Sequence, residues 1–128
     1  MTGIFQGVKV IDLSWAVVGP WVAKYLAGQG ATVVKVEDMD HVDHLRVTPP
    51  YKDGKPGVNR SGYFAAFNSN KKSLGLNIEH PEGMKIMKRL VGWSDVLVES
   101  FRPGVMERLG LRYEELRKIK PDIILLRT

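Results

Sequence analysis

The sequence predicts an α/β fold, in which an open and mainly parallel sheet is flanked by helices. Short runs of aliphatic and β-branched residues, at 8–13, 31–36 and 95–98, have the length and composition of buried strands. Segments with apolar residues at helical spacing lie between them. Strands that alternate with helices form βαβ units, whose strands are parallel. The 128 residues are enough for one domain with a packed core.

The pattern of residues 8–36 predicts a first βαβ unit. Residues 8–13 (VKVIDL) form the first strand. Gly19-Pro20 marks the start of a helix, because proline is favoured in the first helical turn. Gly28 or Gly30 ends this helix, and residues 31–36 (ATVVKV) form the second strand.

Charges and turn residues interrupt the chain after the second strand. We expect a long exposed loop over residues 38–61, in which Pro49-Pro50 and Asp53-Gly54 disfavour regular structure. A short helical turn at 63–67 then leads into a strand at 74–78. Long loops in compact domains are often functional, so the loop is a candidate for part of a site.

A second alternation of helix and strand follows. His80 precedes Pro81 and is predicted to cap an amphipathic helix that covers the sheet. The apolar face of this helix consists of Met84, Met87, Leu90 and Val91. The next strand, at 95–98, ends in a loop at 99–104.

Two short helices and one more strand complete the pattern. One helix ends near Gly110, the other covers 113–118, and the strand lies at 123–126. Only Arg127 and Thr128 follow this strand, so we expect nothing to cover its far side. A doubly wound sheet has helices on both faces, and we therefore interpret the chain as the opening part of a larger fold.

Composition limits the classes of protein to which the chain can belong. Nineteen Lys and Arg against 14 Asp and Glu give a charge of +5, which favours anionic ligands such as nucleotides. The absence of Cys removes disulfides, thiolate nucleophiles and thiolate zinc sites. No apolar run is long enough to span a bilayer, and there is no signal-peptide pattern. We expect a cytoplasmic protein with no membrane partner.

The motifs of several common sites are missing or out of context. Gly28-Gln29-Gly30 resembles a dinucleotide fingerprint, but the third glycine is absent and the segment precedes a strand instead of opening a helix. No Ser has the glycine-framed turn of hydrolases. Five possible metal ligands lie within one short segment: Asp38, Asp40, His41, Asp43 and His44. Their place in a polar loop favours solvated side chains, so we predict no metal site.

The segments after each strand are the best candidates for a site, because open parallel sheets bind ligands beyond the carboxyl ends of their strands. Residues 14–20 are predicted to place backbone N–H groups and a helix N-terminus where they can bind a phosphate or a carbonyl oxygen. The alternative interpretation is an ordinary turn between a strand and a helix. Glu37 has the position of a ribose-binding acid, but without the glycine motif a solvated carboxylate is the better interpretation.

Basic residues lie near two other strand ends. Residues 68–73 (NSNKKS) suit a phosphate, although lysines in turns are more often only solvated. Arg102 and Arg108 follow a strand end, where their guanidinium groups either hold an anion or remain surface charges. The residues alone identify no catalytic group.

A nucleic-acid partner is not expected. The basic residues are dispersed, and no nucleic-acid motif is present. The tryptophans are more typical of core or interface positions than of base-stacking platforms, because they do not alternate with basic residues on a surface strand. They are Trp15, Trp21 and Trp93.

Several stretches together carry a resemblance to one known family. They are residues 7–13 (GVKVIDL) with Gly19-Pro20, 26–37 (LAGQGATVVKVE), Tyr63-Phe64, 68–73 (NSNKKS), Pro81-Glu82-Gly83 and, most diagnostic, 95–110 (DVLVESFRPGVMERLG). In this order and spacing they resemble the family III CoA-transferases, also called the CaiB/BaiF family, over nearly the whole chain.

The resemblance implies a transferase that moves CoA from an acyl-CoA donor to a free carboxylic acid, on a large Rossmann-like domain of interlocked homodimers. In this family an aspartate attacks the thioester and then carries CoA as an aspartyl-CoA intermediate. The resemblance places that aspartate beyond Thr128, and none of Asp12, Asp38, Asp95 and Asp122 matches it. The chain then corresponds to the N-terminal part of the family's domain, with CoA or acyl-CoA as substrate and no tightly bound cofactor.

The same resemblance implies that residues at the strand ends form part of a CoA site. Some members of the family have a polar residue at the position of Val17. Some have an arginine at the position of Asp38, so this chain has a carboxylate where they have a cation. We expect the phosphates near Arg102, Arg108 or the lysines of 68–73. The predicted CoA contacts are Val17, Val18, Asp38, Leu76, Asn77, Ile78, Glu79, Ser100, Phe101, Arg102 and Arg108.

Two alternatives remain open beside this interpretation. In the first alternative, the chain is a module that binds CoA or a nucleotide without catalysis. In the second, it is a subunit that another chain completes. The sequence does not identify the acyl donor or the acceptor acid.

Overall fold

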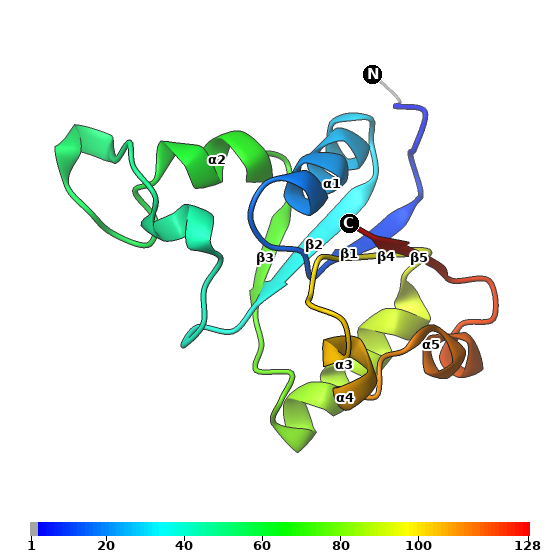
Figure 1. Ribbon diagram of the computed structural model, residues 1–128. Coiled ribbons are helices and arrows are strands. Elements are labelled where there is room, and N and C mark those ends of the chain that lie inside the picture. Colours follow the sequence, from blue (N-terminus) through cyan, green and yellow to red (C-terminus); the bar gives the residue numbers. More distant parts are fainter. Residues whose placement is uncertain (1–2) are drawn as a thin grey trace.

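The structure is a computed structural model that describes residues 3–128, and its centre is one five-stranded parallel sheet (Figure 1). The strands are β1 (Lys9–Asp12), β2 (Thr32–Glu37), β3 (Lys72–Gly75), β4 (Val96–Glu99) and β5 (Ile124–Arg127). The α-helices are α1 (Val18–Gly28), α2 (Gly62–Asn68), α3 (Pro81–Trp93), α4 (Val105–Arg108) and α5 (Tyr113–Ile119). Two short 3-10 helices, η1 (His44–Val47) and η2 (Lys52–Gly54), lie between β2 and α2.

The strand order is β3-β2-β1-β4-β5, and every neighbouring pair is parallel. The chain starts in the middle of the sheet, moves outward to β3 and then returns to place β4 on the other side of β1. In open sheets of this order, a crevice forms where the direction of winding reverses, beyond the carboxyl ends of the two central strands. The topology therefore predicts a ligand-binding crevice at the ends of β1 and β4.

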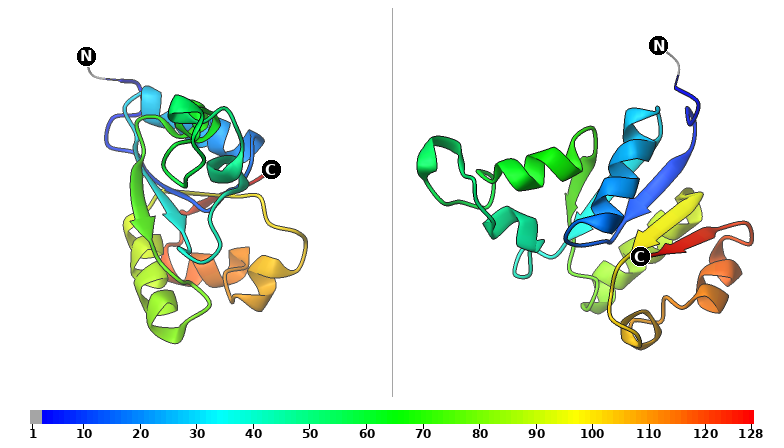
Figure 2. Two further views of the ribbon diagram at one scale, coloured as in Figure 1. Left: turned by 90° about the vertical axis from the view of Figure 1, so that its left-hand side faces the viewer. Right: turned by 45° about the horizontal axis from the view of Figure 1, so that its top comes forward.

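Helices cover both faces of the sheet (Figures 1 and 2). Helices α1 and α2 lie on one face, and α3, α4 and α5 lie on the other. The core under α3, α4 and α5 includes Ile11, Met87, Val91, Leu97, Met106 and Leu116. The core under α1 is smaller and consists of Val10, Ala23, Ala31, Val33 and Val98. The predicted α/β class, with a parallel sheet and helices, is confirmed.

One predicted strand is displaced along the chain. We expected it at 74–78, but β3 spans Lys72–Gly75. Leu76 still donates its backbone N–H to Glu37, and the chain then turns. The side chain of Asn77 forms this turn by accepting hydrogen bonds from the backbone N–H groups of Glu79 and His80. A local side-chain acceptor therefore competes with the strand, as asparagine commonly does at turns.

The predicted cap of the amphipathic helix is confirmed. Nδ1 of His80 accepts the backbone N–H of Glu82 at 3.2 Å, directly before α3. The expectation of an exposed loop over 38–61 is wrong in part, because η1 and η2 lie within it and Asp43, Leu45 and Arg46 are buried. These three residues close the α1 face of the sheet beside β2.

The outer strand β5 is only partly covered. Ile124 is 60% exposed, and Leu126 packs only at the margin of the core under α1. Among the residues that the structure describes, no helix combines the length and the apolar character needed to cross a membrane.

Candidate functional site

Two loops meet at the carboxyl ends of β1 and β4, where the topology predicts a crevice. The loop after β1 carries Trp15, and the loop after β4 carries Ser100. The hydroxyl of Ser100 accepts the backbone N–H of Trp15 at 2.7 Å and lies 3.2 Å from the Trp15 carbonyl, to which it donates. The ring of Phe101 meets the ring of Trp15 edge to face, with 6.4 Å between centroids. The two loops therefore form one unit.

The first cavity, which we call the strand-end cavity, has a volume of about 290 Å³. Its walls are mainly apolar, and its polar groups are carboxylates, one histidine and one arginine. Its lining residues are Leu13, Trp15, Val36, Glu37, Asp38, His41, Leu76, Ile78, Glu79, Phe101, Val105, Arg108 and Leu109. An apolar cleft with a few polar groups is the usual form of a site for an aromatic ligand such as a nucleobase.

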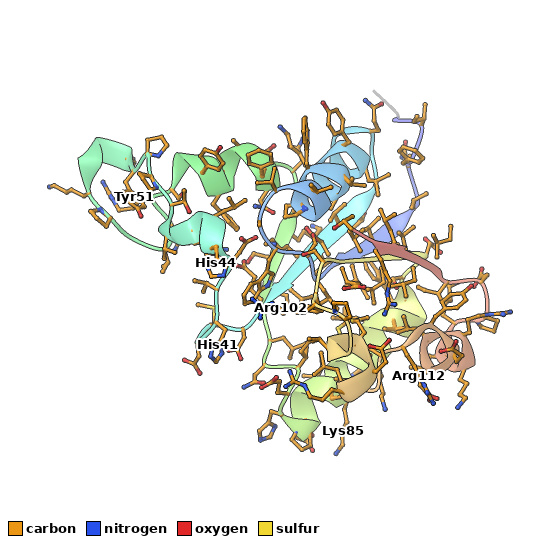
Figure 3. All side chains as sticks on the ribbon, in the orientation of Figure 1. His41, His44, Tyr51, Lys85, Arg102 and Arg112 are labelled. Carbon is orange, nitrogen blue, oxygen red and sulfur yellow. The ribbon has the colours of Figure 1, made fainter. Side chains whose placement is uncertain are left out.

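The second cavity, which we call the loop cavity, is more open and measures about 660 Å³. It lies at the start of α1. Its lining residues are Trp15, Ala16, Val17, Val18, Gly19, His44, Ser100, Phe101, Arg102, Val105 and Thr128. Figure 3 shows His44 and Arg102 near the crevice, on different segments of the chain.

The two cavities adjoin each other. Trp15, Phe101 and Val105 line both of them. A long ligand can therefore extend from the strand ends, across the Trp15 and Phe101 rings, to the start of α1. This shape suits a molecule with a bulky group at one end and a flexible arm.

Ten of the eleven predicted contact residues line one of these cavities. Those of the strand-end cavity are Asp38, Leu76, Ile78, Glu79, Phe101 and Arg108. Those of the loop cavity are Val17, Val18, Ser100, Phe101 and Arg102. Asn77 lines neither of them, because its side chain is used in the turn before α3.

Several of these polar groups already have partners. Nη2 of Arg108 lies 3.2 Å from Oε1 of Glu79, and both side chains are largely exposed. Oδ1 of Asp38 accepts the backbone N–H of Asp40 at 2.9 Å, and Oδ2 lies 3.6 Å from Nδ1 of His41. Arg108 is the arginine that lines the strand-end cavity, and its guanidinium already forms an ion pair with the carboxylate of Glu79.

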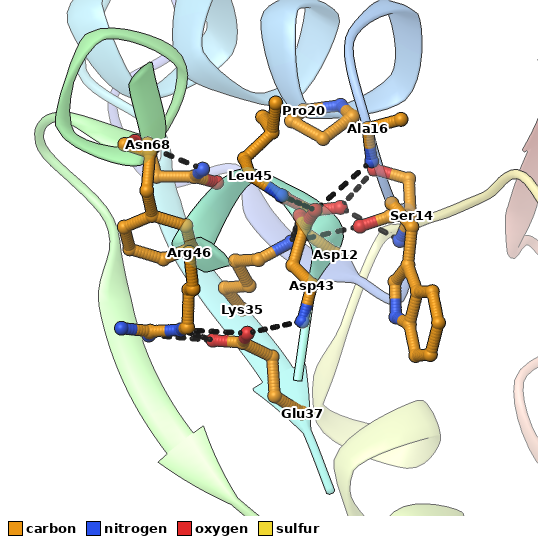
Figure 4. Close-up of polar contacts among 12 residues, drawn as sticks. Asp12, Ser14, Ala16, Pro20, Lys35, Glu37, Asp43, Leu45, Arg46 and Asn68 are labelled. Atoms are coloured by element: carbon orange, nitrogen blue, oxygen red, sulfur yellow. Dashed lines mark hydrogen bonds and ion pairs between the residues drawn. The ribbon is translucent and has the colours of Figure 1, made fainter. Parts of the chain in front are cut away.

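A buried polar network supports the loop after β1 (Figure 4). Asp43 is fully buried, and its Oδ2 lies 3.0 Å from Nζ of Lys35. Oδ1 of Asp43 accepts the backbone N–H groups of Leu45 and Ala16, at 3.0 and 3.1 Å. Ala16 has φ = 63°, a conformation that is unfavourable for a residue with a side chain. The contact with Asp43 fixes Ala16 in the shape that lines the loop cavity.

Glu37 belongs to the same network, and the expectation that it is solvated is wrong. It is 4% exposed and forms a two-pronged ion pair with Arg46, with Nε–Oε1 at 2.9 Å and Nη2–Oε2 at 2.7 Å. Burial opposes its ionisation, but the hydrogen bonds from Arg46 and the backbone of Asp43, with the charges of Arg46 and Lys35, outweigh burial and lower the pKa of Glu37.

Lys71 is not solvated, which was one of the two sequence-based interpretations, and its ammonium group is bound by groups of the protein itself. Its side chain is 2% exposed, and Nζ lies 2.7 Å from Oδ2 of Asp12. Nζ also donates to the carbonyl of Pro20 and the side chain of Asn68, at 2.8 and 2.7 Å. Burial lowers the pKa of Lys71, and the Asp12 carboxylate reverses only part of that change. Lys71 therefore joins β1, α1 and α2.

The five potential metal ligands do not gather around one point. Over residues 3–128, no group of three His, Asp or Glu side chains has a geometry suited to a metal ion. Asp43 instead pairs with Lys35, while His41 and His44 line different cavities.

Sequence reasoning predicted the loop after β1 as a site but missed the side chain of Trp15 as part of it. Trp15 is half-buried and lines both cavities, and Trp21 is 47% exposed, so neither belongs to the core; the other expectation, an interface position, stays a prediction. The signal for Trp15 was its place directly after β1, at the strand end that such sheets use for ligands. His41 and His44 were considered only as metal ligands.

A family model decides the classification. The model for CoA-transferase family III matches residues 5–128, which is nearly the whole chain. The chain belongs to CoA-transferase family III. The resemblance inferred from the sequence motifs is thereby confirmed.

Relatives within family III include several named CoA-transferases. The succinate–glutarate CoA-transferase of Agrobacterium fabrum is 38% identical over 121 residues, which cover 93% of this chain and 30% of that protein. The acetyl-CoA:oxalate CoA-transferase of Acetobacter aceti is 41% identical over 122 residues, which cover 95% of this chain and 30% of that protein. The chain thus spans less than a third of the length of these relatives.

A solved structure agrees with the fold. A CaiB/BaiF family protein from Brucella suis superimposes with a TM-score of 0.87 and 34% sequence identity, covering 99% of this chain and 33% of that one. The parallel sheet and its helices therefore match a family III structure.

Proposed function

We propose that this chain forms the N-terminal part of a CoA-transferase that moves CoA from a thioester donor to a free carboxylic acid, and that it supplies part of the CoA site. The observation that carries the proposal is the pair of adjoining cavities at the ends of β1 and β4, lined by ten of the eleven residues predicted from the family. The relatives named as CoA-transferases support the reaction class.

The strand-end cavity suits the adenosine end of CoA. Leu76, Ile78 and Leu109 offer apolar contacts to a purine ring. Arg108 supplies a cation at the rim for a phosphate. The arm of CoA would then cross Trp15 and Phe101 and bring its sulfur to the loop cavity.

In this proposal the covalent step belongs to an aspartate outside these 128 residues. That carboxylate attacks the donor thioester and expels CoA thiolate, which leaves a mixed anhydride of the aspartate and the donor acid. The thiolate then attacks the aspartyl carbonyl, which forms aspartyl-CoA and releases the donor carboxylate. The acceptor carboxylate attacks aspartyl-CoA to give a second mixed anhydride and free thiolate, and the thiolate attacks the acceptor's acyl carbon, which forms the new thioester and frees the aspartate. The residues of this chain bind and orient CoA for these steps.

Thermal melts of the purified chain test CoA binding apart from catalysis. CoA at a hundred times its Kd should raise Tm by roughly 10 °C, because a ligand that binds only the folded state stabilises it. ATP and inorganic phosphate serve as controls and should raise Tm less. A cooperative melt that CoA does not move would contradict the proposal.

A pair of variants localises the effect. Ile78→Arg introduces a long charged side chain into the strand-end cavity and should abolish the CoA-induced rise. Ile86→Arg is the matched control, because Ile86 is 44% exposed on α3 and lies away from both cavities. The melts without ligand show whether each variant is folded.

A further inference from the structure

Two basic side chains in the loop cavity have no polar partner within residues 3–128. The guanidinium of Arg102 makes no hydrogen bond or ion pair there, whereas those of Arg46 and Arg108 are both paired with carboxylates. The imidazole of His44 makes no hydrogen bond in this part of the chain, and the residue is exposed and lines the cavity. Its ring meets Trp15 edge to face at 5.6 Å between centroids, which holds it against the cavity wall.

The charge of the loop cavity differs from that of its neighbour. Two acidic residues without a buried ion pair, Asp38 and Glu79, line the strand-end cavity. Glu37 also lines it, but its carboxylate is bound to Arg46 on the α1 face of the sheet. Among residues 3–128, no Asp or Glu side chain lines the loop cavity. Arg102 and His44 therefore face a space without a competing side-chain carboxylate, which is a suitable environment for an anion.

The two groups come from separate elements and suit a carboxylate in particular. Arg102 follows β4, and His44 begins η1. A guanidinium binds a carboxylate through two parallel hydrogen bonds, and an imidazole has an N–H donor in either protonation state. Most of the other lining residues are apolar, among them Val17, Val18 and Val105. Such walls suit a short aliphatic chain that leads to the carboxylate.

We infer that the loop cavity binds a carboxylate at the far end of the acyl group, and that Arg102 and His44 make the site selective for the CoA thioesters of dicarboxylic acids. The inference rests on the proposed function, in which the sulfur of CoA reaches the loop cavity. Arg102 and His44 act on substrate choice and not on the covalent step.

Calorimetric titration of the chain with two thioether analogues of CoA tests this inference. S-(3-carboxypropyl)-CoA and S-butyl-CoA have the same chain length and differ in a terminal carboxylate or methyl group, and neither hydrolyses as a thioester does. The carboxylate analogue should bind about tenfold more tightly, as expected for a hydrogen-bonded charge pair at a partly exposed site.

Variants assign the selectivity to residues. Arg102→Gln and His44→Gln should each reduce the ratio of the two affinities toward one. Arg89→Gln is the control, because Arg89 is an exposed arginine on α3 that lines neither cavity, and it should keep the wild-type ratio.

Each outcome separates the inference from the function on which it rests. Equal affinities for the two analogues, or a ratio that survives both variants, overturn the inference and leave CoA binding in place. Failure of CoA and of both analogues to bind overturns the proposed function, and the inference with it.

Discussion

At the scale of single residues, the charged groups turned toward the interior were the hardest to predict. Lys35 and Glu37 occupy alternate positions of β2 and point to the α1 face, where a strand of this length normally places apolar side chains. Their partners, Asp43 and Arg46, lie in a segment that we expected to be an exposed loop. Single-sequence reasoning cannot pair such groups, because burial of a charge becomes favourable only when the partner is in place.

Glu37→Gln should reveal this pairing through pH. The pKa of Glu37 is lowered in the folded protein, so its contribution to stability is complete above its unfolded pKa of about 4.5 and is lost as the pH falls through the folded value. At pH 7 the variant should lose about 3 kcal/mol, because Arg46 is left buried without its partner.

Urea unfolding at pH 7 and at acid pH measures the effect. The difference between the wild-type protein and Glu37→Gln should narrow at acid pH, where the native carboxyl group is also protonated. Asp40→Asn, at an exposed position just after β2, is the control and should change stability by less than about 0.5 kcal/mol. A difference that does not depend on pH would contradict the assignment.

At the scale of elements, periodicity predicted the order of strands and helices well. The predicted strand at 31–36 nearly matches β2, and the predicted amphipathic helix after His80 matches the start of α3. Buried strands and amphipathic helices have strong sequence patterns. The start of β3 was missed since Lys72 and Ser73 are polar, and its pairing with β2 is a tertiary effect. The loop after β1 was predicted as a site by its position, but its anchors, Asp43 and Ser100, are remote in sequence.

Gly19→Ala should disturb that loop. A Cβ at Gly19 would lie 2.3 Å from Cβ of Ser14, and Ser14 cannot easily retreat because it is buried and hydrogen-bonded to Asp12. The variant should lose roughly 1–3 kcal/mol of stability and change the fluorescence of Trp15.

Gly28→Ala provides the matched comparison. It lies in the same helix, and a Cβ there would meet no atom within 4 Å. This substitution should be neutral or stabilise the protein by up to about 1 kcal/mol, because alanine favours helix more than glycine does. Chemical denaturation of both variants checks the pair, and an unaffected Gly19→Ala would show that the loop adapts.

At the scale of the whole molecule, the site is a product of topology. Trp15 and Phe101 are far apart in sequence, and they meet because β4 is placed beside β1. The sequence predicts that strand ends gather at one edge, and the family resemblance names most of the residues there. The division into two cavities of different charge could not be predicted, since it depends on which side chains are already paired.

The partly covered strand β5 has a consequence for the behaviour of the chain in solution. Its outer edge has no neighbouring strand among residues 3–128, and it carries aliphatic residues such as Ile124. An exposed, apolar edge offers backbone hydrogen-bonding groups to a strand of another molecule, so we expect slow aggregation at high concentration.

Ile124→Lys should suppress this aggregation, because a charge on an edge strand opposes the approach of a second strand. Light scattering during concentration measures it, with Ile4→Lys, 80% exposed at the other end of the chain, as the control. Equal protection by both substitutions would mean that added charge alone is responsible. If only Ile124→Lys protects, the shelf life of the purified protein is governed by the β5 edge of its sheet and not by the β3 edge.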